Sequence, residues 1–310
     1  MLDLIPAVVF AGSIGLLASF LLELLLDPKA GVPWRRHWAS LAIHAGIWLV
    51  WFGMGMAIVQ RPVFSAVTGL ALLTLIVMVN NAKFHSLREP FVAQDFEYFS
   101  DAIRHPRLYI PFLGWGRALL IGFVVIVAIA IGLLLEPSLL SSAGMRVLWV
   151  HSLGCMLVGG VFWGIGHWWS EPVRYQPGAD LSCFGLVAYL WHYWYDERRQ
   201  IDAIIGDGGL RGVSGRSDGT TLPDLVVVQS ESFFDPRPIF PLLRTDLLGA
   251  FDTLKVESIE CGRLKVPAWG ANTVRSEFAF LSGLPNASLG VHQFNPYRRY
   301  VWSRPDTLAT

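Results

Sequence analysis

The sequence predicts an all-α polytopic membrane domain with about five spans, followed by the start of an α/β domain. The chain is 53% hydrophobic and only 15% charged over 310 residues, which is more apolar than ordinary soluble proteins. Nearly all of its long apolar runs precede residue 170, and residues 206–221 have the glycine-rich composition of a flexible linker. We therefore divide the chain into a transmembrane domain at 1–170, a juxtamembrane helix and linker at 171–222, and a partial α/β domain at 223–310.

Five apolar runs are long enough to cross a bilayer, which takes about 20 residues of helix. They lie at residues 5–26, 38–59, 63–80, 118–135 and 147–168. The first run has no basic start and no small-residue cleavage site, so we interpret it as a retained span rather than a signal peptide. Tryptophans near the span ends, among them Trp38 and Trp168, are typical of an aromatic belt at the membrane surface.

Two further segments are apolar in part but too short or too polar to cross. Residues 181–195 are rich in Trp, Tyr and His and run into Asp-Glu-Arg-Arg, which favours an interfacial helix over a sixth span. Residues 83–116 alternate polar and aromatic side chains. They fit either an ordinary amphipathic loop helix or a wall of a lipid headgroup site.

Basic residues give conflicting indications of membrane orientation. Lys29, Arg35 and Arg36 follow the first run, and five more basic residues lie between the third and fourth. The positive-inside rule would place both loops in the cytoplasm, and five spans would then leave the last segment cytoplasmic too. A crossing at 181–195 would return that segment to the outside.

The segment after the linker alternates predicted strands and helices, as an α/β domain does. Residues 225–229 form an apolar, β-branched run typical of a buried parallel strand. Residues 241–251 and 273–281 are predicted helices, and residues 255–259 and 263–266 are predicted short strands. Ligands gather at the carboxyl ends of strands in open α/β sheets, and Glu231 falls at such an end.

Four polar residues in this segment could form a phosphoryl-transfer site. Thr273 stands at a predicted helix start, where free N–H groups and the helix dipole favour a bound phosphate. A divalent metal held by Glu231 and touching the Thr273 oxygen would make that hydroxyl a nucleophile. Asn272 and Arg275 could donate to phosphate oxygens. The plain structural alternatives are a Thr N-cap, a solvated Glu231 carboxylate, and an ion pair of Arg275 with Glu277 or Asp252.

The two motifs that carry these residues resemble a known family. Gln-Ser-Glu-Ser-Phe at 229–233 and Gly-Ala-Asn-Thr-Val-Arg-Ser-Glu-Phe at 270–278 are similar to the lipoteichoic acid synthase-type phosphoglycerol transferases. That family belongs to the sulfatase/alkaline phosphatase superfamily. Residues 81–91 and the order of parts, five spans, a juxtamembrane helix and a sulfatase-like domain, agree with it as well.

The resemblance implies a reaction, a cofactor and a location. It makes Glu231 a metal-ligand carboxylate and Thr273 the nucleophile that also touches the metal, typically Mn²⁺ or Mg²⁺. Thr273 would attack phosphatidylglycerol, release diacylglycerol, and pass the glycerophosphoryl group to an acceptor hydroxyl. The protein would be multi-pass in the cytoplasmic (inner) membrane, with its C-terminal domain facing outside. Nothing in the zero net charge points to nucleic acid as a partner, and the oligomeric state is left open.

One departure from the family bears on activity. The family also uses an Asp-His pair later in the domain, and no Asp-His dipeptide follows Thr273 here. We therefore expect a truncated sulfatase-like domain that is inactive alone. The alternatives are a non-catalytic membrane scaffold, a phosphoethanolamine transferase, which its few cysteines disfavour, and a small transporter, which the lack of paired mid-span charges disfavours.

Overall fold

Long helices dominate the computed structural model, which describes residues 4–97, 136–198, 226–230, 233–267 and 272–298 and scattered positions between 104 and 134. Within these ranges the chain contains helices and irregular segments but no strand. Contacts divide the chain into two units. The first unit joins Met1–Gln200 to Leu289–Asn295, and the second joins Ile201–Ser288 to Pro296–Thr310.

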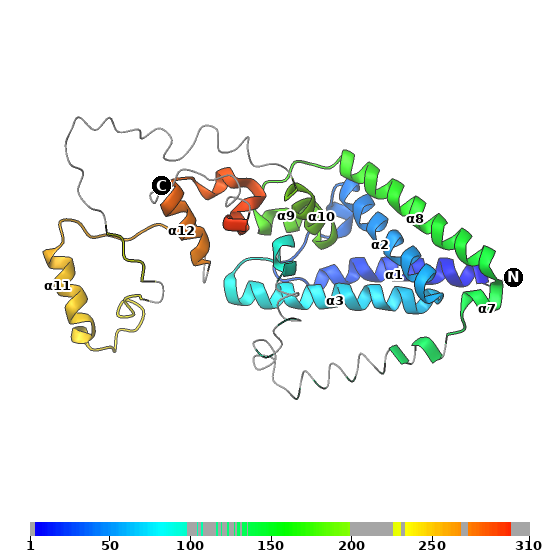
Figure 1. Cartoon of the computed structure of the whole chain (residues 1–310), viewed down its shortest axis with the longest axis horizontal. Coiled ribbons are helices and arrows are strands. Elements are labelled where there is room, and N and C mark those ends of the chain that lie inside the picture. The colour runs from blue at the N-terminus through cyan, green and yellow to red at the C-terminus, as the bar shows by residue number, and fades with distance from the viewer. Residues whose placement is uncertain are drawn as a thin grey trace. The chain divides into compact units, whose positions relative to one another are not determined.

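Four helices of the first unit are long and apolar enough to cross a membrane: Pro6–Leu25, Trp38–Val59, Pro62–Leu87 and Met145–Trp168, with mean hydropathy between 1.6 and 2.3. The helices α1 (Leu4–Leu22, continued by the 3₁₀ turn Glu23–Leu25), α2 (Trp38–Val59), α3 (Pro62–Leu87) and α8 (Met145–Trp168) provide them (Figure 1). These confirm four of the five predicted spans, and the protein is a multi-pass membrane protein. The predicted span at 118–135 lies largely outside the described residues.

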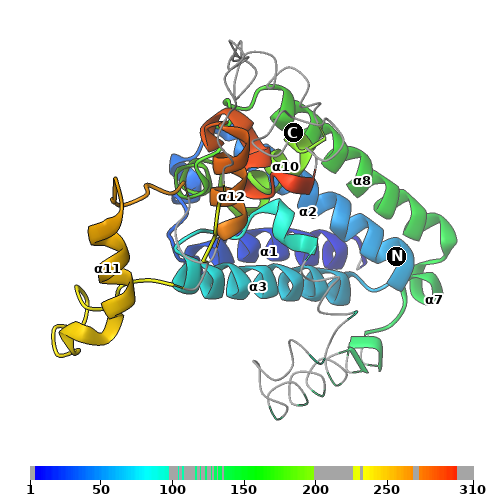
Figure 2. The ribbon, with the colours of Figure 1, turned by 60° about the vertical axis from the view of Figure 1, so that its left-hand side comes forward.

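Helices α2 and α8 pack closely because small residues face each other across their interface (Figure 2). A β-carbon added to Gly159 would lie 2.7 Å from the carbonyl oxygen of Gly46, and one added to Gly166 would lie 2.6 Å from that of Ala39. Neither position has room for a side chain. The absence of a side chain at Gly159 and Gly166 therefore allows the α8 backbone to approach the α2 backbone this closely.

The juxtamembrane region forms two short helices, α9 (Pro177–Phe184) and α10 (Leu186–Asp196), which meet at Gly185. Gly185 has φ of +75°, in the region that favours glycine, and a side chain there would collide with the Arg36 guanidinium. The 11 residues of α10 are too few to cross a bilayer, which agrees with the predicted non-crossing helix.

Aromatic side chains of α10 form the centre of the larger hydrophobic core. Tyr189 and Tyr193 are fully buried there. Asp180 accepts the Tyr193 hydroxyl at 2.8 Å, so the phenol is buried with a partner. Val291 and Phe294 of the C-terminal part of the chain join the same core.

The described part of the loop after α3 contains a 3₁₀ turn, whereas the sequence analysis had left open an amphipathic loop helix or a wall of a lipid headgroup site. Arg88 ends α3 in the left-handed region, and the chain then enters a 3₁₀ turn at Ala93–Asp95. Phe91 is only 2% exposed, because it packs into the same core as Tyr189. Lys83 pairs with Asp95 at 2.6 Å and holds the turn against the end of α3. Burial raises the pKa of Asp95, and the nearby Lys83 opposes that rise. The described part of this loop is therefore packed, and its remainder up to residue 116 lies mostly outside the described residues.

The second unit shows helices where the sequence analysis expected an α/β start. They are a 3₁₀ turn at Thr245–Leu248, α11 (Gly249–Glu257) and α12 (Thr273–Ser282). The helix predicted at 241–251 begins later and runs further, so the first residues of the predicted strand 255–259 belong to α11 instead. Helix-forming residues such as Leu254 and Lys255 continue the turn that begins at Gly249, which explains that error.

The other predicted strands are irregular in the described residues. Val226, Val227 and Val228 are 83%, 54% and 83% exposed, and Leu264 is 77% exposed. A strand needs a neighbour for its N–H and C=O groups, and no ladder is present in the described part of this unit. The sulfatase-like α/β domain is therefore not seen among these residues.

Candidate functional site

The first turn of α12 holds three of the four predicted site residues. Asn272 is the N-cap, with non-helical φ and ψ of −91° and 50°, and its carbonyl accepts the backbone N–H of Arg275 at 3.1 Å. Thr273 is the first helical residue, one position inside the cap. The helix then ends at Gly283, whose φ of +67° favours glycine. The predicted helix at 273–281 is thus confirmed, and the N-cap role considered for Thr273 belongs to Asn272.

The arrangement of this turn suits an anion. The first N–H groups of a helix have no intrahelical acceptor, and the macrodipole adds positive potential at the same end. Thr273 is half-buried, and Arg275 is 7% exposed. An amide, a hydroxyl and a guanidinium therefore belong to the N-cap, the first and the third position of one helix.

Glu231, the fourth predicted residue, lies outside the described residues, as does Ser232. The irregular segment 226–230 precedes it. A metal shared by Glu231 and Thr273 therefore stays a prediction. Their carboxylate and hydroxyl oxygens are the hard donors that Mg²⁺ and Mn²⁺ prefer. Among the side chains that the structure describes, no group of three or more His, Cys, Asp or Glu is placed to hold a metal.

An ion-pair cluster that the sequence analysis missed organises the chain before α12. Arg237 donates to Asp235 at 2.8 Å, to Asp252 of α11 at 2.6 Å, and to the carbonyl of Thr245 at 2.9 Å. Hydrogen bonds from Arg237 lower the pKa of Asp235 to about 2. Asp252 therefore forms its ion pair with Arg237, whereas the sequence analysis had considered Arg275 as its partner.

The Glu277 carboxylate on α12 also has a partner. It accepts the hydroxyl of Tyr297 at 2.7 Å, and the Tyr297 ring meets Phe278 edge-on at 5.4 Å. Partial burial, followed by this hydrogen bond, raises the pKa of Tyr297 to about 12. These contacts hold the middle of α12 in place. They do not involve Thr273 in its first turn.

A second polar cluster lies in the membrane unit, at the end of the first span, whereas the sequence analysis had considered only paired charges at mid-span. Glu23, fully buried at the end of the first span, pairs with Arg36 and lies 3.3 Å from Nδ1 of His44. His44 Nε2 is 2.8 Å from the hydroxyl of Ser19, which also donates to the carbonyl of Leu16 at 2.7 Å. The signal available in the sequence was a carboxylate inside an apolar run, since ionisable residues in spans are costly unless paired.

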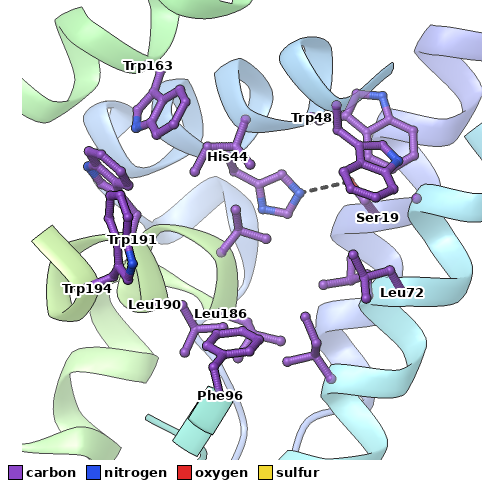
Figure 3. Close-up of a pocket in the computed structure, with 16 residues that line it drawn as sticks. Ser19, His44, Trp48, Leu72, Phe96, Trp163, Leu186, Leu190, Trp191 and Trp194 are labelled. Atoms are coloured by element: carbon purple, nitrogen blue, oxygen red, sulfur yellow. Dashed lines mark hydrogen bonds between the residues drawn. The ribbon is translucent and has the colours of Figure 1, made fainter. Parts of the chain in front are cut away.

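Next to this cluster lies a pocket of about 380 Å³ (Figure 3). Its walls come from α1, α2, α3, α8 and α10 and from Phe96 after the 3₁₀ turn. Tryptophans and aliphatic side chains provide most of the lining, including Trp48, Trp191 and Leu190. The first unit therefore contains a cavity in addition to its packed cores.

Comparison with curated proteins finds one distant relative. The chain is 26% identical over 270 residues to the capsular polysaccharide biosynthesis protein RkpI of Rhizobium meliloti (strain 1021). The match covers 78% of this chain and 47% of that protein, so the chain spans about half the length of the relative. No family model matches the chain, and no solved structure matches it. The resemblance to lipoteichoic acid synthase-type enzymes stays a hypothesis carried by the two motifs.

Proposed function

We propose that the protein is a membrane-anchored transferase of the sulfatase type, which moves a phosphoglycerol group from phosphatidylglycerol during synthesis of a cell-envelope polymer. The observation that carries the proposal is the first turn of α12, with Thr273 at its first position beside Asn272 and Arg275. The four candidate spans and the distant relationship to a capsular polysaccharide biosynthesis protein support it.

Each residue has a part in the proposed reaction. The Thr273 hydroxyl attacks phosphorus, the bond to the diacylglycerol oxygen breaks, and diacylglycerol leaves after taking up a proton. The N–H groups at the start of α12 and the Arg275 guanidinium hold the phosphate oxygens. An acceptor hydroxyl then attacks the glycerophosphoryl-threonine and restores Thr273.

Glu231 and Thr273 would hold the metal, Mn²⁺ or Mg²⁺. Their oxygen donors fit such an ion, although two ligands are fewer than a complete site has. When bound, the ion supplies positive charge that lowers the pKa of the nucleophilic hydroxyl. We place the second unit outside the cytoplasmic membrane, where it would meet lipid headgroups of the outer leaflet.

Because we expect this chain to be inactive alone, the test uses the chain together with whatever sequence its genomic locus encodes after residue 310. It measures release of labelled diacylglycerol from phosphatidylglycerol vesicles that contain this purified protein and Mn²⁺. Thr273→Val keeps the shape of the side chain but removes the nucleophile, so we expect release to stop and a glycerophosphoryl adduct at residue 273 to disappear from mass spectra. Ser276→Ala, on the same helix, should leave both unchanged. Release that persists in Thr273→Val would exclude this nucleophile. Absence of both release and adduct in the unaltered protein would favour the alternative of a non-catalytic membrane subunit.

A further inference from the structure

We infer that the pocket in the membrane unit binds one acyl chain of a glycerophospholipid. It is enclosed by the candidate spans α1, α2, α3 and α8 and by the juxtamembrane helix α10, all in the first unit. Its volume of about 380 Å³ lies in the range of roughly 300–1,000 Å³ that is usual for ligand pockets.

The lining selects hydrocarbon over a headgroup. Ser19 and His44 are its polar side chains apart from the indoles, and they bond to each other at 2.8 Å (Figure 3). His44 also faces Glu23, whose other partners are Arg36 and the N–H of Val187. Both polar groups are thus already paired and 2% exposed or less. A charged headgroup would find no counter-charge here, whereas a methylene chain would gain burial against Trp and Leu side chains.

The residues at the mouth of the pocket indicate that the acyl chain enters from the surrounding lipid. Leu72, Phe96 and Trp194 line the pocket and are themselves 42%, 42% and 39% exposed. On α3, Leu72 continues into the exposed apolar face formed by Leu75 and Met78, which are 47% and 64% exposed. On a membrane-spanning helix such a face contacts lipid tails. The pocket is therefore continuous with the protein–lipid interface, from which an acyl chain can enter sideways.

This inference deepens the proposed function, on which its biological meaning rests. A phosphatidylglycerol donor has two acyl chains that must stay in the membrane while its phosphate reaches Thr273. Holding one chain against α10 would fix the donor beside the juxtamembrane helices and raise its local concentration. The binding itself is independent of the chemistry and can be measured without turnover.

The experiment uses the full chain in vesicles that contain phosphatidylglycerol with a photoreactive group at the end of one acyl chain. After illumination, adducts are mapped by mass spectrometry. We expect them on the peptide that contains Leu190 and Trp194. Ile76→Trp fills the pocket and should lower adduct yield about tenfold, since the indole takes the space of several methylenes. Leu190→Phe is a second filling variant with the same expectation.

Leu75→Trp is the matched control, because it puts the same side chain one position away on the exposed face of α3 and should leave the yield unchanged. Adducts spread evenly over the spans, or equal yields in Ile76→Trp and Leu75→Trp, would overturn the inference. So would displacement of the label by a polyprenyl phosphate but not by unlabelled phosphatidylglycerol. Thr273→Ala should label normally. In the unaltered protein, normal labelling without turnover would count against the proposed reaction alone, and turnover without labelling would count against the pocket alone.

Discussion

The Glu23 carboxylate accepts the backbone N–H of Val187 at 3.1 Å, and so joins the end of the first span to the start of α10. The same carboxylate pairs with Arg36 and lies beside His44, all within a buried environment. Three segments that are remote in sequence therefore depend on one negative charge.

Glu23→Gln should strongly destabilise the membrane unit. It leaves the Arg36 guanidinium buried without its counter-charge, and loss of one partner from a buried pair costs about 3–5 kcal/mol. Thermal unfolding in detergent measures the loss. Glu171→Gln, at an exposed position, is the control and should unfold like the unaltered protein. The double variant Glu23→Met with Arg36→Met should be more stable than Glu23→Gln, and equal stability of the two would argue against the ion pair.

Gly159→Ala should disrupt the contact between α2 and α8. The added β-carbon would lie 2.7 Å from the Gly46 carbonyl oxygen and 2.9 Å from the Val50 nitrogen, both backbone atoms. We expect a loss of about 1–3 kcal/mol, typical of overpacking. Gly160→Ala is a neighbouring control, because a β-carbon there meets no atom within 4 Å. The midpoint of thermal unfolding is measured for both variants and should be lower for Gly159→Ala. Equal midpoints would contradict this packing.

Acidification should weaken the juxtamembrane helices through His192. This side chain is 4% exposed and bonds to the Ser170 hydroxyl at 2.8 Å. Burial, and then the nearby His167, lowers its pKa from 6.5 to about 4. The unfolded chain thus takes up a proton before the folded one, so the stabilisation present above pH 6.5 is lost as the pH falls towards 4.

Between pH 7 and pH 5 this linkage predicts a loss of about 2 kcal/mol, measured as the change in unfolding free energy. His192→Gln has no titrating group and should lack that part of the pH dependence. His151→Gln removes a histidine on α8, outside the juxtamembrane helices, and should keep that part of the pH dependence. An identical pH profile for His192→Gln and the unaltered protein would rule His192 out as its origin.

Phe294→Ala should release the segment Leu289–Asn295 from the first unit. Phe294 is 8% exposed, and its ring lies 5.4 Å from that of Tyr193. Removing a buried Phe side chain costs about 3–5 kcal/mol. Hydrogen exchange should become faster in peptides that cover residues 289–295. Phe280→Ala, at a position that is 46% exposed, should leave this exchange unchanged. Unaltered exchange in Phe294→Ala would show that other contacts hold the segment.

The sequence predicted the features of this fold that depend on local pattern. Apolar runs of bilayer length located four spans, and the glycine at 283 marked the end of α12. Strands were predicted at 225–229, from its apolar and β-branched composition, and at 263–266. A strand also requires a pairing partner that composition does not reveal. Lys255 was assigned to a strand because the helix signal that begins at Gly249 was followed for too few residues.

The candidate site was predictable to a similar degree. Asn272, Thr273 and Arg275 belong to the same helix start, which their spacing in the sequence predicts. The cluster of Glu23, Arg36 and His44 was missed because Glu23 and Arg36 are 13 residues apart and meet only once the chain has turned from α1 into α2. The same holds for Arg237 and Asp252, which are 15 residues apart.

The return of residues 289–295 to the first unit makes the piece that carries Thr273 an insertion held at both ends rather than a free tail. A loop closed at its two ends has fewer conformations than a chain anchored once. A single protease cut between residues 206 and 221 would therefore leave the two fragments associated after detergent extraction. They would separate only when the contacts of Val291, Gln293 and Phe294 with the rest of the first unit are lost as well.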